Sequence, residues 1–278
     1  MYDDIMACPV CGMGLQLTDQ SFKCEKGHSF DLSAKGYANL LMSQDKHSKE
    51  PGDSKEMVAA RKRFLEQGYY EPLATDLAQT VMSLFSEFKS TSPVILDAGC
   101  GEGYYTHFID DSLRDSGIHT RIIGMDISKD AVKAAAKRPG PDFYVASLFK
   151  LPLRNQSADL IINAFAPACD SEFSRVLKKD GFLVVVIPGK NHLFTLKSVI
   201  YDSPYENDEK EPELPSFNLF EKKRIEGEIT VLGKDSVFDL LSMTPYYWRT
   251  PEEGVNRLKN VDSLKTAIEF IILVYKLK

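Results

Sequence analysis

Four side chains near the N-terminus have the types and the spacing of a metal site. Cys8 and Cys11 form a C-x2-C pair, and Cys24 and His28 follow with three residues between them. Thiolates and imidazoles are the ligands that Zn²⁺ prefers, and a structural site uses four of them in a tetrahedron. We therefore predict one structural zinc ion with no coordination position left open for catalysis. So small a segment buries little core, so the metal would supply much of its folding free energy, about 10–16 kcal/mol.

A glycine-rich turn further along the chain could hold a nucleoside. Residues 94–96 are apolar and predict a short buried strand, which Asp97 ends. Gly99, Gly101 and Gly103 then occupy every second position. Without a Cβ, a ligand can lie against the backbone, and the start of the following helix offers free N–H groups. A tight turn that binds nothing would use the same glycines.

A second carboxylate is expected beside this turn. Asp126 ends the next predicted strand, at 121–126. A carboxylate there can accept hydrogen bonds from both ribose hydroxyls of a nucleoside. The alternative is that Asp126 only stabilises the N-terminus of the following helix.

Alternating strands and helices would position these residues. Strands are predicted at 94–98, 121–126, 142–146, 158–164 and 181–187, with helices between them. This alternation predicts a parallel sheet with helices on both faces, and a ligand site beyond the carboxyl ends of the strands. Residues 226–232 and 270–277 predict two more strands, the last of them antiparallel at the sheet edge.

The segment before this sheet predicts a hairpin and a helix. Residues 15–24 alternate as a hairpin does. A helical apolar stripe follows over 57–65, and Asp53 with Glu56 resembles a capping box at its start. Arg61, Lys62 and Arg63 lie partly outside the stripe, where they would contact RNA phosphate or form a solvated face.

Composition narrows the class of protein. The chain has 278 residues, 43% of them hydrophobic, which suits one large domain plus a small one. There is no stretch of eighteen apolar residues and no signal peptide, so we expect a cytoplasmic protein with no membrane partner. The net charge of −6 argues mildly against RNA binding. However, six acids fall within 202–213, and basic residues cluster at 46–49 and 61–63.

The turn resembles motif I of class I S-adenosylmethionine (SAM) methyltransferases, and other blocks resemble a narrower family. Over nearly the whole chain the sequence is similar to bacterial 23S rRNA (guanine-N1)-methyltransferases. The blocks that carry this resemblance are CPVCG, KCEKGHSFDLSAKGYANLL, PGDSKEM, GYYEPL, LDAGCGEGYYTH, IPGKNHL and SMTPYYWR.

The resemblance implies a fold, a cofactor and a partner. The expected fold is α/β, a Rossmann-like class I methyltransferase with a mainly parallel seven-stranded sheet and a small N-terminal zinc ribbon. It divides the chain into an RNA-recognising zinc ribbon (1–40), a helical linker (41–90) and a SAM-dependent domain (91–278). Members of the family commonly form homodimers, and they methylate N1 of a guanine in a hairpin loop of 23S rRNA domain II. Two neighbouring guanines are possible targets, one of them linked to macrolide resistance of the tylosin type, and the residues do not distinguish them.

The same comparison suggests which residues hold SAM. Asp97 would orient the turn or meet the amino group, and Asp126 would hold the ribose. Ser147 stands where many relatives carry an aspartate that binds adenine. By resemblance Tyr70 and His192 are also cofactor residues, with core packing and helix capping as the alternatives. The residues expected to contact the methionine and ribose parts of SAM are Gly99, Gly101, Glu102 and Gly103.

Three further residues are candidates for the reacting site. The enzyme mainly has to align the methyl group with its acceptor, and guanine N1 must also lose a proton. No general base is identified. Asn163 ends the fourth strand of the sheet, and Phe165 or Trp248 could stack on a flipped base, although packing in the core would also explain both.

Two other classes of function remain open. A methyltransferase of a small metabolite would share the SAM motif and suits the acidic charge, but such an enzyme rarely needs a zinc ribbon. The second class is a non-catalytic adaptor that binds RNA through its zinc ribbon. The three glycines of the turn and Asp126 argue against it, because they are intact.

Overall fold

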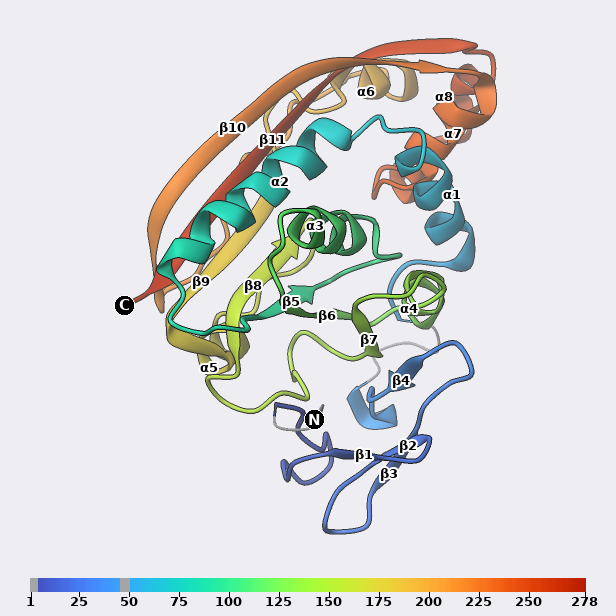
Figure 1. The fold of residues 1–278 in the computed structure, drawn as a ribbon. Coiled ribbons are helices and arrows are strands. Elements are labelled where there is room, and N and C mark those ends of the chain that lie inside the picture. Colours follow the sequence, from blue (N-terminus) through green and yellow to red (C-terminus); the bar gives the residue numbers. More distant parts are fainter. Residues whose placement is uncertain (1–4, 46–50) are drawn as a thin grey trace.

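The computed structural model describes residues 5–45 and 51–278. The predicted basic cluster at 46–49 lies outside these ranges. The chain forms a small antiparallel sheet near the N-terminus and one large, mainly parallel sheet (Figure 1).

The small sheet contains β1 (Gln16–Thr18), β2 (Ser21–Lys23) and β3 (Ser29–Asp31), in that order. β1 and β2 pair as an antiparallel hairpin, so the alternation predicted over 15–24 is confirmed. The hairpin places Cys24 directly after β2, close to the Cys8–Cys11 turn.

The large sheet has the strand order β10-β11-β9-β8-β5-β6-β7-β4. The strands from β4 to β9 are parallel, whereas β11 is antiparallel to both β9 and β10. The chain order reverses between β5 and β8, which is the switch point where such sheets bind ligands. Its strands are β4 (Tyr37–Asn39), β5 (Val94–Ala98), β6 (Arg121–Asp126), β7 (Asp142–Val145), β8 (Ala158–Ala164), β9 (Leu177–Pro188), β10 (Phe217–Leu232) and β11 (Ser263–Leu277).

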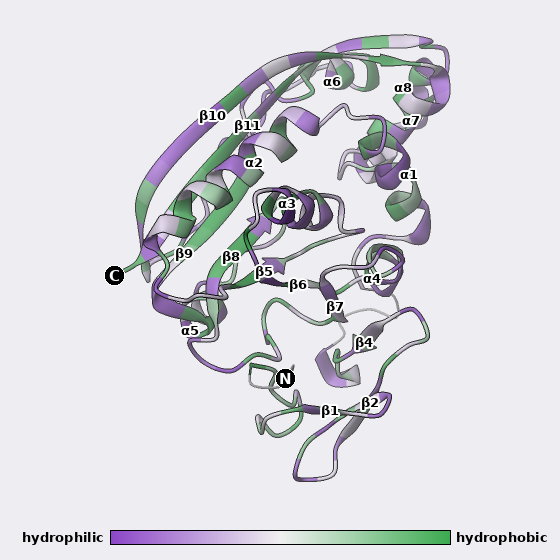
Figure 2. Cartoon of the chain, viewed as in Figure 1, coloured by the Kyte–Doolittle hydropathy of each residue, from purple (hydrophilic) through white to green (hydrophobic). Residues whose placement is uncertain are grey.

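Over residues 5–45 and 51–278 the sheet has eight strands rather than the predicted seven, because β4 of the N-terminal segment pairs with β7 at its edge. All seven predicted strands are present, and two of them are much longer than predicted. β10 begins at Phe217 rather than 226, and β11 at Ser263 rather than 270. Most of β10 is exposed at the sheet edge and carries many charges, which hides it from a search for apolar residues. Figure 2 shows β10 in alternating hydrophilic and hydrophobic bands, while β8 and β9 are mostly hydrophobic.

Eight α-helices accompany the strands in the described part of the chain. They are α1 (Lys55–Leu65), α2 (Glu71–Ser83), α3 (Tyr104–Asp115), α4 (Lys129–Ala135), α5 (Asp170–Val176), α6 (Phe194–Ile200), α7 (Lys234–Ser242) and α8 (Glu252–Leu258). Short 3-10 turns occur at η1 (Ser43–Asp45), η2 (Leu84–Glu87) and η3 (Tyr247–Arg249).

The start of α1 differs from the predicted capping box. The hydroxyl of Ser54, not Asp53, accepts the hydrogen bond from the Met57 N–H. A side chain at the N-cap satisfies one of the helix's free N–H groups, so Ser54 is enough to begin the helix. Asp53 is therefore available for another partner, described below.

The two faces of the large sheet are covered by different parts of the chain. Residues of α1, α2, α3, α6, α7 and α8 pack on one face, together with Ile95 of β5. Leu96, the next residue of β5, packs on the other face with α5 and with side chains of the N-terminal segment. The rings of Phe22 and Tyr144 meet there edge to face, with centroids 5.7 Å apart. The zinc module therefore shares a hydrophobic core with the large sheet.

Backbone hydrogen bonds also join the N-terminal segment to the large sheet. β4 pairs in parallel with β7, from Tyr37 opposite Phe143 to Asn39 opposite Val145. The Ala7 N–H donates to the carbonyl of Pro152 at 2.9 Å. The predicted boundary at residue 40 thus follows a strand of the large sheet, and the three-part division remains a prediction.

Within the described residues, no helix has both the length and the apolar character needed to cross a membrane.

Candidate functional site

The four predicted metal ligands converge on one point. Their ligand atoms all lie within 4.8 Å of one another. Cys11 Sγ is 3.8 Å from Cys24 Sγ, and His28 Nδ1 is 3.6 Å from Cys8 Sγ and 3.3 Å from Cys24 Sγ. Bond lengths of about 2.3 Å to sulfur and about 2.0 Å to nitrogen imply a tetrahedral S–S edge of about 3.8 Å and an S–N edge of about 3.5 Å. The donor set therefore fits zinc in both chemistry and size.

Two tight turns create this cluster. The Gly12 N–H donates to the carbonyl of Cys8 at 2.8 Å, and the Gly27 N–H donates to the carbonyl of Cys24 at 2.9 Å. Each turn directs its pair of ligands to the same side. Although burial opposes it, hydrogen bonding by the backbone and side chain of His28 lowers the pKa of the Cys24 thiol to about 6, which favours the thiolate that binds metal.

The glycine turn lies at the carboxyl end of β5, where the strand order reverses. The Gly99 N–H donates to the carbonyl of Met125 at 2.8 Å, which ties the turn to the end of β6. Gly99 has a φ of +96°, and a Cβ on it would overlap the side chain of Ala166. Only glycine fits here, because the loop after β8 lies directly against this backbone.

Two aspartates hold the turn in shape. Asp97 is buried and accepts a hydrogen bond of 2.5 Å from Thr106 Oγ1 of α3. Asp126 accepts the N–H of Gly101 at 3.0 Å on one oxygen and the N–H of Ser128 at 2.7 Å on the other. Each carboxylate oxygen has a further lone pair, so Asp126 can still accept hydrogen bonds from a ligand.

Three carboxylates surround the turn with little solvent. Burial raises the pKa of Asp97 to about 7 and that of Glu102 to about 7, and it also raises the pKa of Asp126. An ionised carboxylate in such a place is stabilised by a cation. The arrangement therefore favours a ligand that carries positive charge, as SAM does.

Two buried acceptors at the turn lack hydrogen-bond partners among the described residues. They are Glu102 Oε2 and Asn163 Oδ1. Asn163 lies beside the turn, because its Nδ2 donates to the carbonyl of Ala98 at 2.8 Å. Buried acceptors are normally paired, so both atoms suit a ligand rich in donors. SAM offers an ammonium group, two ribose hydroxyls and an adenine amine, so these residues fit it.

Tyr70 and His192 form a pair on the helix-covered face. The Tyr70 hydroxyl lies 3.1 Å from His192 Nε2, and the Glu269 N–H donates to His192 Nδ1 at 3.3 Å. Burial lowers the pKa of His192 to about 3, so the ring is neutral. With Nδ1 accepting, the proton resides on Nε2 and is donated to the Tyr70 oxygen. The phenolic hydrogen of Tyr70 can then be donated to a ligand.

Phe165 is an exposed aromatic residue at the end of β8. It is non-glycine with a φ of +56°, and its side chain is 45% exposed. Such a backbone is strained by about 1–2 kcal/mol and is often found at functional sites. The Phe165 ring contacts Phe270, which in turn contacts His192. The structure therefore places Phe165 next to both the glycine turn and the Tyr70–His192 pair.

Ser147 and Trp248 are the two remaining predicted residues. Ser147 follows β7 and its hydroxyl accepts the N–H of Phe149 at 3.2 Å, which leaves the hydroxyl hydrogen for another partner. Trp248 is on η3, contacts Tyr247 and is 68% exposed, so it is not a core residue.

Arg61 is at this site although the sequence does not place it there. Its guanidinium lies 2.5 Å from Asp53 Oδ2 and 3.9 Å from Glu102 Oε2. Arg61 is not part of a solvated face, because α1 packs this side chain against the glycine turn. The predicted contact of this basic cluster with RNA phosphate stays a prediction. Arg61 is far from the glycine turn in the sequence, so no local sequence pattern predicts that the two lie together.

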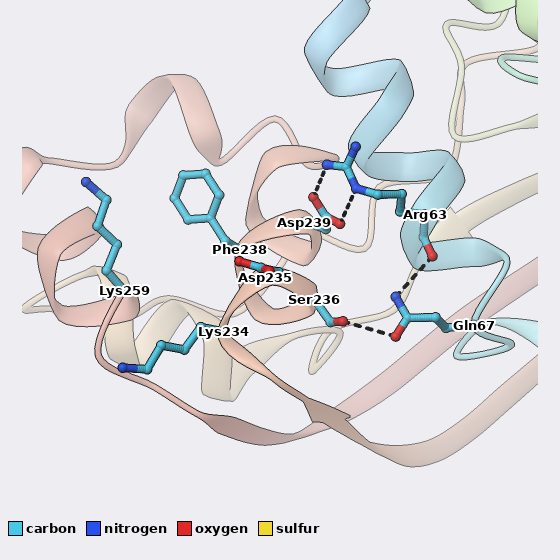
Figure 3. Close-up of a pocket in the computed structure, with 8 residues that line it drawn as sticks. All are labelled: Arg63, Gln67, Lys234, Asp235, Ser236, Phe238, Asp239 and Lys259. Carbon is cyan, nitrogen blue, oxygen red and sulfur yellow. Dashed lines mark hydrogen bonds and ion pairs between the residues drawn. The ribbon is translucent and has the colours of Figure 1, made fainter.

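The other two basic residues of α1 are also paired within the chain. Lys62 meets Glu66, and Arg63 forms a two-pronged pair with Asp239 of α7. Figure 3 shows the latter pair at a cavity of about 660 Å³ between α1 and α7. No residue of the glycine turn and none of the three buried carboxylates lines this cavity, so it is not the predicted cofactor site.

The sheet, the glycine turn and the acids at its strand ends define a class I SAM-dependent methyltransferase. Residues 89–233 match the family model described as "Methyltransferase domain", and residues 6–49 match the zinc-ribbon model described as "RlmA, N-terminal". The chain belongs to the family of 23S rRNA (guanine-N1)-methyltransferases, as full-length relatives show. The predicted enzyme class, SAM and structural zinc are thereby confirmed.

Three of these relatives cover most of the chain. A Streptomyces fradiae protein named 23S rRNA (guanine(748)-N(1))-methyltransferase is 30% identical, over 93% of this chain and 91% of its own. The Bacillus subtilis (strain 168) protein YxjB, named as a candidate 23S rRNA (guanine-N1)-methyltransferase, is 30% identical over 96% and 95%. A similarly named protein of Micromonospora griseorubida is 35% identical over 70% of each chain.

Proposed function

We propose that this enzyme methylates N1 of one guanine in a hairpin loop of 23S rRNA domain II. One observation carries the proposal: a zinc cluster and a glycine turn with three buried carboxylates are joined through one hydrophobic core, because the zinc module packs on the sheet that ends in the turn. A zinc ribbon fixed beside the cofactor site suits a large substrate such as folded RNA better than a small metabolite.

The turn and its neighbours would hold the cofactor. When bound, SAM supplies an electrophilic methyl group. Asp126 would accept the ribose hydroxyls, and Asp97 and Glu102 would balance the positive charge. Tyr70, oriented by His192, would donate its hydroxyl hydrogen, and Ser147 would face the adenine. The backbone of Gly99, Gly101 and Gly103 would lie along the cofactor.

The aromatic side chains would hold the base. Phe165 is exposed, fixed by its neighbours and next to the turn, so it is well placed to stack on a flipped guanine. Trp248 would stack on a neighbouring base. Asn163 would support the turn and present its free acceptor to a donor in the bound complex. No side chain is assigned as the base that removes the N1 proton.

The target can be tested on the complete, zinc-loaded protein. Incubation with labelled SAM and protein-free 23S rRNA from a strain lacking the gene, followed by mass spectrometry, would locate any modified nucleotide. We expect a single methyl group on guanine N1 in the domain II hairpin, and much less label with the Asp126→Asn variant when SAM is limiting. Binding of SAM without label on rRNA or on ribosomal precursor particles would contradict the proposal.

Two finer points depend on the same proposal. Mapping would show which of the two neighbouring guanines is used, a question on which one relative's name points to guanine 748. The homodimer implied by the family resemblance stays a prediction. Analytical ultracentrifugation of the free protein would decide it, and a monomer at micromolar concentration would contradict it.

A further inference from the structure

Arg61 connects three segments that are far apart in the sequence. Besides its ion pairs with Asp53 and Glu102, its guanidinium donates to the carbonyl of Met243 at 3.2 Å. Met243 is the C-cap of α7. A guanidinium has five donors in a rigid fork, so one arginine can hold several partners in a fixed arrangement.

The position of α1 makes this bridge firm. Arg63, two residues away, donates to both carboxylate oxygens of Asp239 on α7, at 2.8 and 2.5 Å (Figure 3). The Ser128 hydroxyl also donates to the carbonyl of Asp53, which ties the start of the linker to α4. Arg61 therefore approaches the glycine turn from a helix that is anchored on two sides.

The segment that begins at Met243 also has a second anchor. We call residues 243–249 the aromatic segment. Its Tyr246 hydroxyl donates to Asn207 Oδ1 at 2.7 Å, and the buried Lys197 donates to the same oxygen at 2.5 Å. Asn207 Nδ2 in turn donates to the carbonyl of His192 at 2.9 Å.

Both anchors of the aromatic segment thus lead to predicted cofactor residues. One runs from Met243 through Arg61 to Glu102, and the other from Tyr246 through Asn207 to His192. Between them and just beyond, the segment presents Trp248, which is the most exposed of the large hydrophobic side chains in the described residues. Two routes of side-chain contacts therefore join the predicted cofactor site to the segment that carries Trp248.

We propose that Arg61 is a positioning residue, which holds the aromatic segment in register with the cofactor turn so that Trp248 is ordered when SAM is bound. The inference rests on the proposed RNA methylation for the use of an ordered Trp248. Its primary test requires only SAM binding and no RNA. Arg61 would act through Met243 and Glu102 and would not contact the reacting atoms.

The chain offers a selective probe, because Trp248 is its single tryptophan. Tryptophan fluorescence of the full, zinc-loaded protein would be recorded during titration with SAM, and SAM binding would be measured independently by calorimetry. In the unaltered protein we expect an emission change that saturates with the calorimetric dissociation constant. In Arg61→Lys, which keeps the charge but not the fork, SAM should still bind while most of the emission change is lost.

Activity provides a second readout. Arg61→Lys should lower kcat about tenfold to a hundredfold, since a misplacement of about 1 Å is enough for such a loss, with a smaller effect on the KM for SAM. Lys62→Gln is the matched control, because Lys62 is the next residue of α1 and pairs only with exposed Glu66 in the described contacts. Its SAM affinity and its emission change on SAM binding should equal those of the unaltered protein.

Tyr246→Phe tests the second anchor if Arg61→Lys does not fold. It removes only the hydroxyl that reaches Asn207, and it should also reduce the emission change while SAM binds. A full emission change with normal kcat in Arg61→Lys would overturn the proposal, and so would complete loss of SAM binding, since Arg61 would then be a direct ligand. A coupled emission change without RNA methylation would leave this inference standing and contradict the proposed function instead.

Discussion

The Tyr70 hydroxyl lies 3.1 Å from His192 Nε2, although 122 positions separate the two residues. The resemblance names each of them as a cofactor residue without relating one to the other. Their contact gives them a joint role, because the neutral imidazole donates to the Tyr70 oxygen and leaves the phenolic hydrogen for an acceptor. His192 would orient the Tyr70 hydroxyl, and Tyr70 would bind SAM.

Tyr70→Phe should therefore weaken SAM binding while the fold is kept. Loss of one neutral hydrogen bond costs about 0.5–1.5 kcal/mol, which corresponds to a roughly threefold to tenfold increase in the dissociation constant by calorimetry. Tyr69→Phe is the matched control, since the Tyr69 hydroxyl instead accepts the Leu232 N–H at 3.1 Å. Equal affinities in the two variants would remove Tyr70 from the site.

Asp126→Asn should have a larger effect, because it removes a charge as well as acceptors. Hydrogen bonds to charged groups contribute about 1.5–3 kcal/mol, so we expect SAM to bind about tenfold to a hundredfold more weakly. The amide NH₂ would also meet the N–H of Gly101 or Ser128 and loosen the turn. Asp130→Asn, at an exposed position of α4, should leave binding unchanged. An unaltered dissociation constant for Asp126→Asn would refute the ribose assignment.

The affinity for SAM should depend on pH around neutrality. Burial raises the pKa of Asp97 from 3.8, and that of Glu102 from 4.5, to about 7. The cationic ligand binds the ionised carboxylates, so its affinity should increase as the pH rises through about 7. Below that pH it should fall by up to about tenfold per unit for each group. Calorimetry between pH 6 and 8 would measure this, and Glu102→Gln should flatten the curve.

The stability of the free protein should change in the opposite direction. Between about pH 4 and 7 the folded state keeps protons that the unfolded chain has already released, so the free energy of unfolding should decrease as the pH rises. Thermal unfolding with and without SAM would show this. A flat affinity profile between pH 6 and 8 would mean that neither carboxylate titrates in the free site.

Cys24→Ser should remove zinc and unfold the small sheet. Three remaining ligands bind the ion too weakly, and zinc supplies much of the module's stability. Elemental analysis should find about one zinc per chain in the unaltered protein and very little in the variant, which proteases should cleave within the first 40 residues. Cys169→Ser is the control, since Cys169 lies at the start of α5, outside the zinc cluster. Full zinc content in Cys24→Ser would refute the four-ligand site.

Phe165→Ala and Trp248→Ala should raise the KM for RNA. Stacking of a base on an aromatic ring is worth about 1–3 kcal/mol, so each substitution should raise the KM for RNA about fivefold to a hundredfold. SAM affinity should not change. Phe220→Ala is the control because Phe220 is also exposed but lies on the edge strand β10, against Phe182. If all three variants lower RNA binding equally, neither candidate is a specific stacking residue.

What the sequence predicts best is chemistry carried by short spacing. The ligands Cys8, Cys11, Cys24 and His28 follow from two local turns, and the three glycines follow from one. The order of strands along the chain follows from apolar runs that a parallel sheet requires. In each case the residues that matter are within a few positions of one another.

What the sequence misses depends on long-range packing. Arg61 meets Met243 across 182 positions, and no local pattern records that α1 lies against α7. β4 has only three residues, too few to show alternation, and its partner β7 follows much later. The exposure of Trp248 is also unexpected, since clusters of aromatic residues are usually buried.

The pairing of β4 with β7 sets an order of events during synthesis. More than a hundred residues separate Asn39 from Asp142, so at about 5–20 residues per second the N-terminal segment leaves the ribosome roughly 5 to 20 seconds before its partner strand exists. All four zinc ligands are available during that interval, whereas most of the large sheet on which the zinc module packs has not yet been synthesised. Metal capture would thus come first and hold the N-terminal segment in shape until β7 is synthesised and can pair with β4.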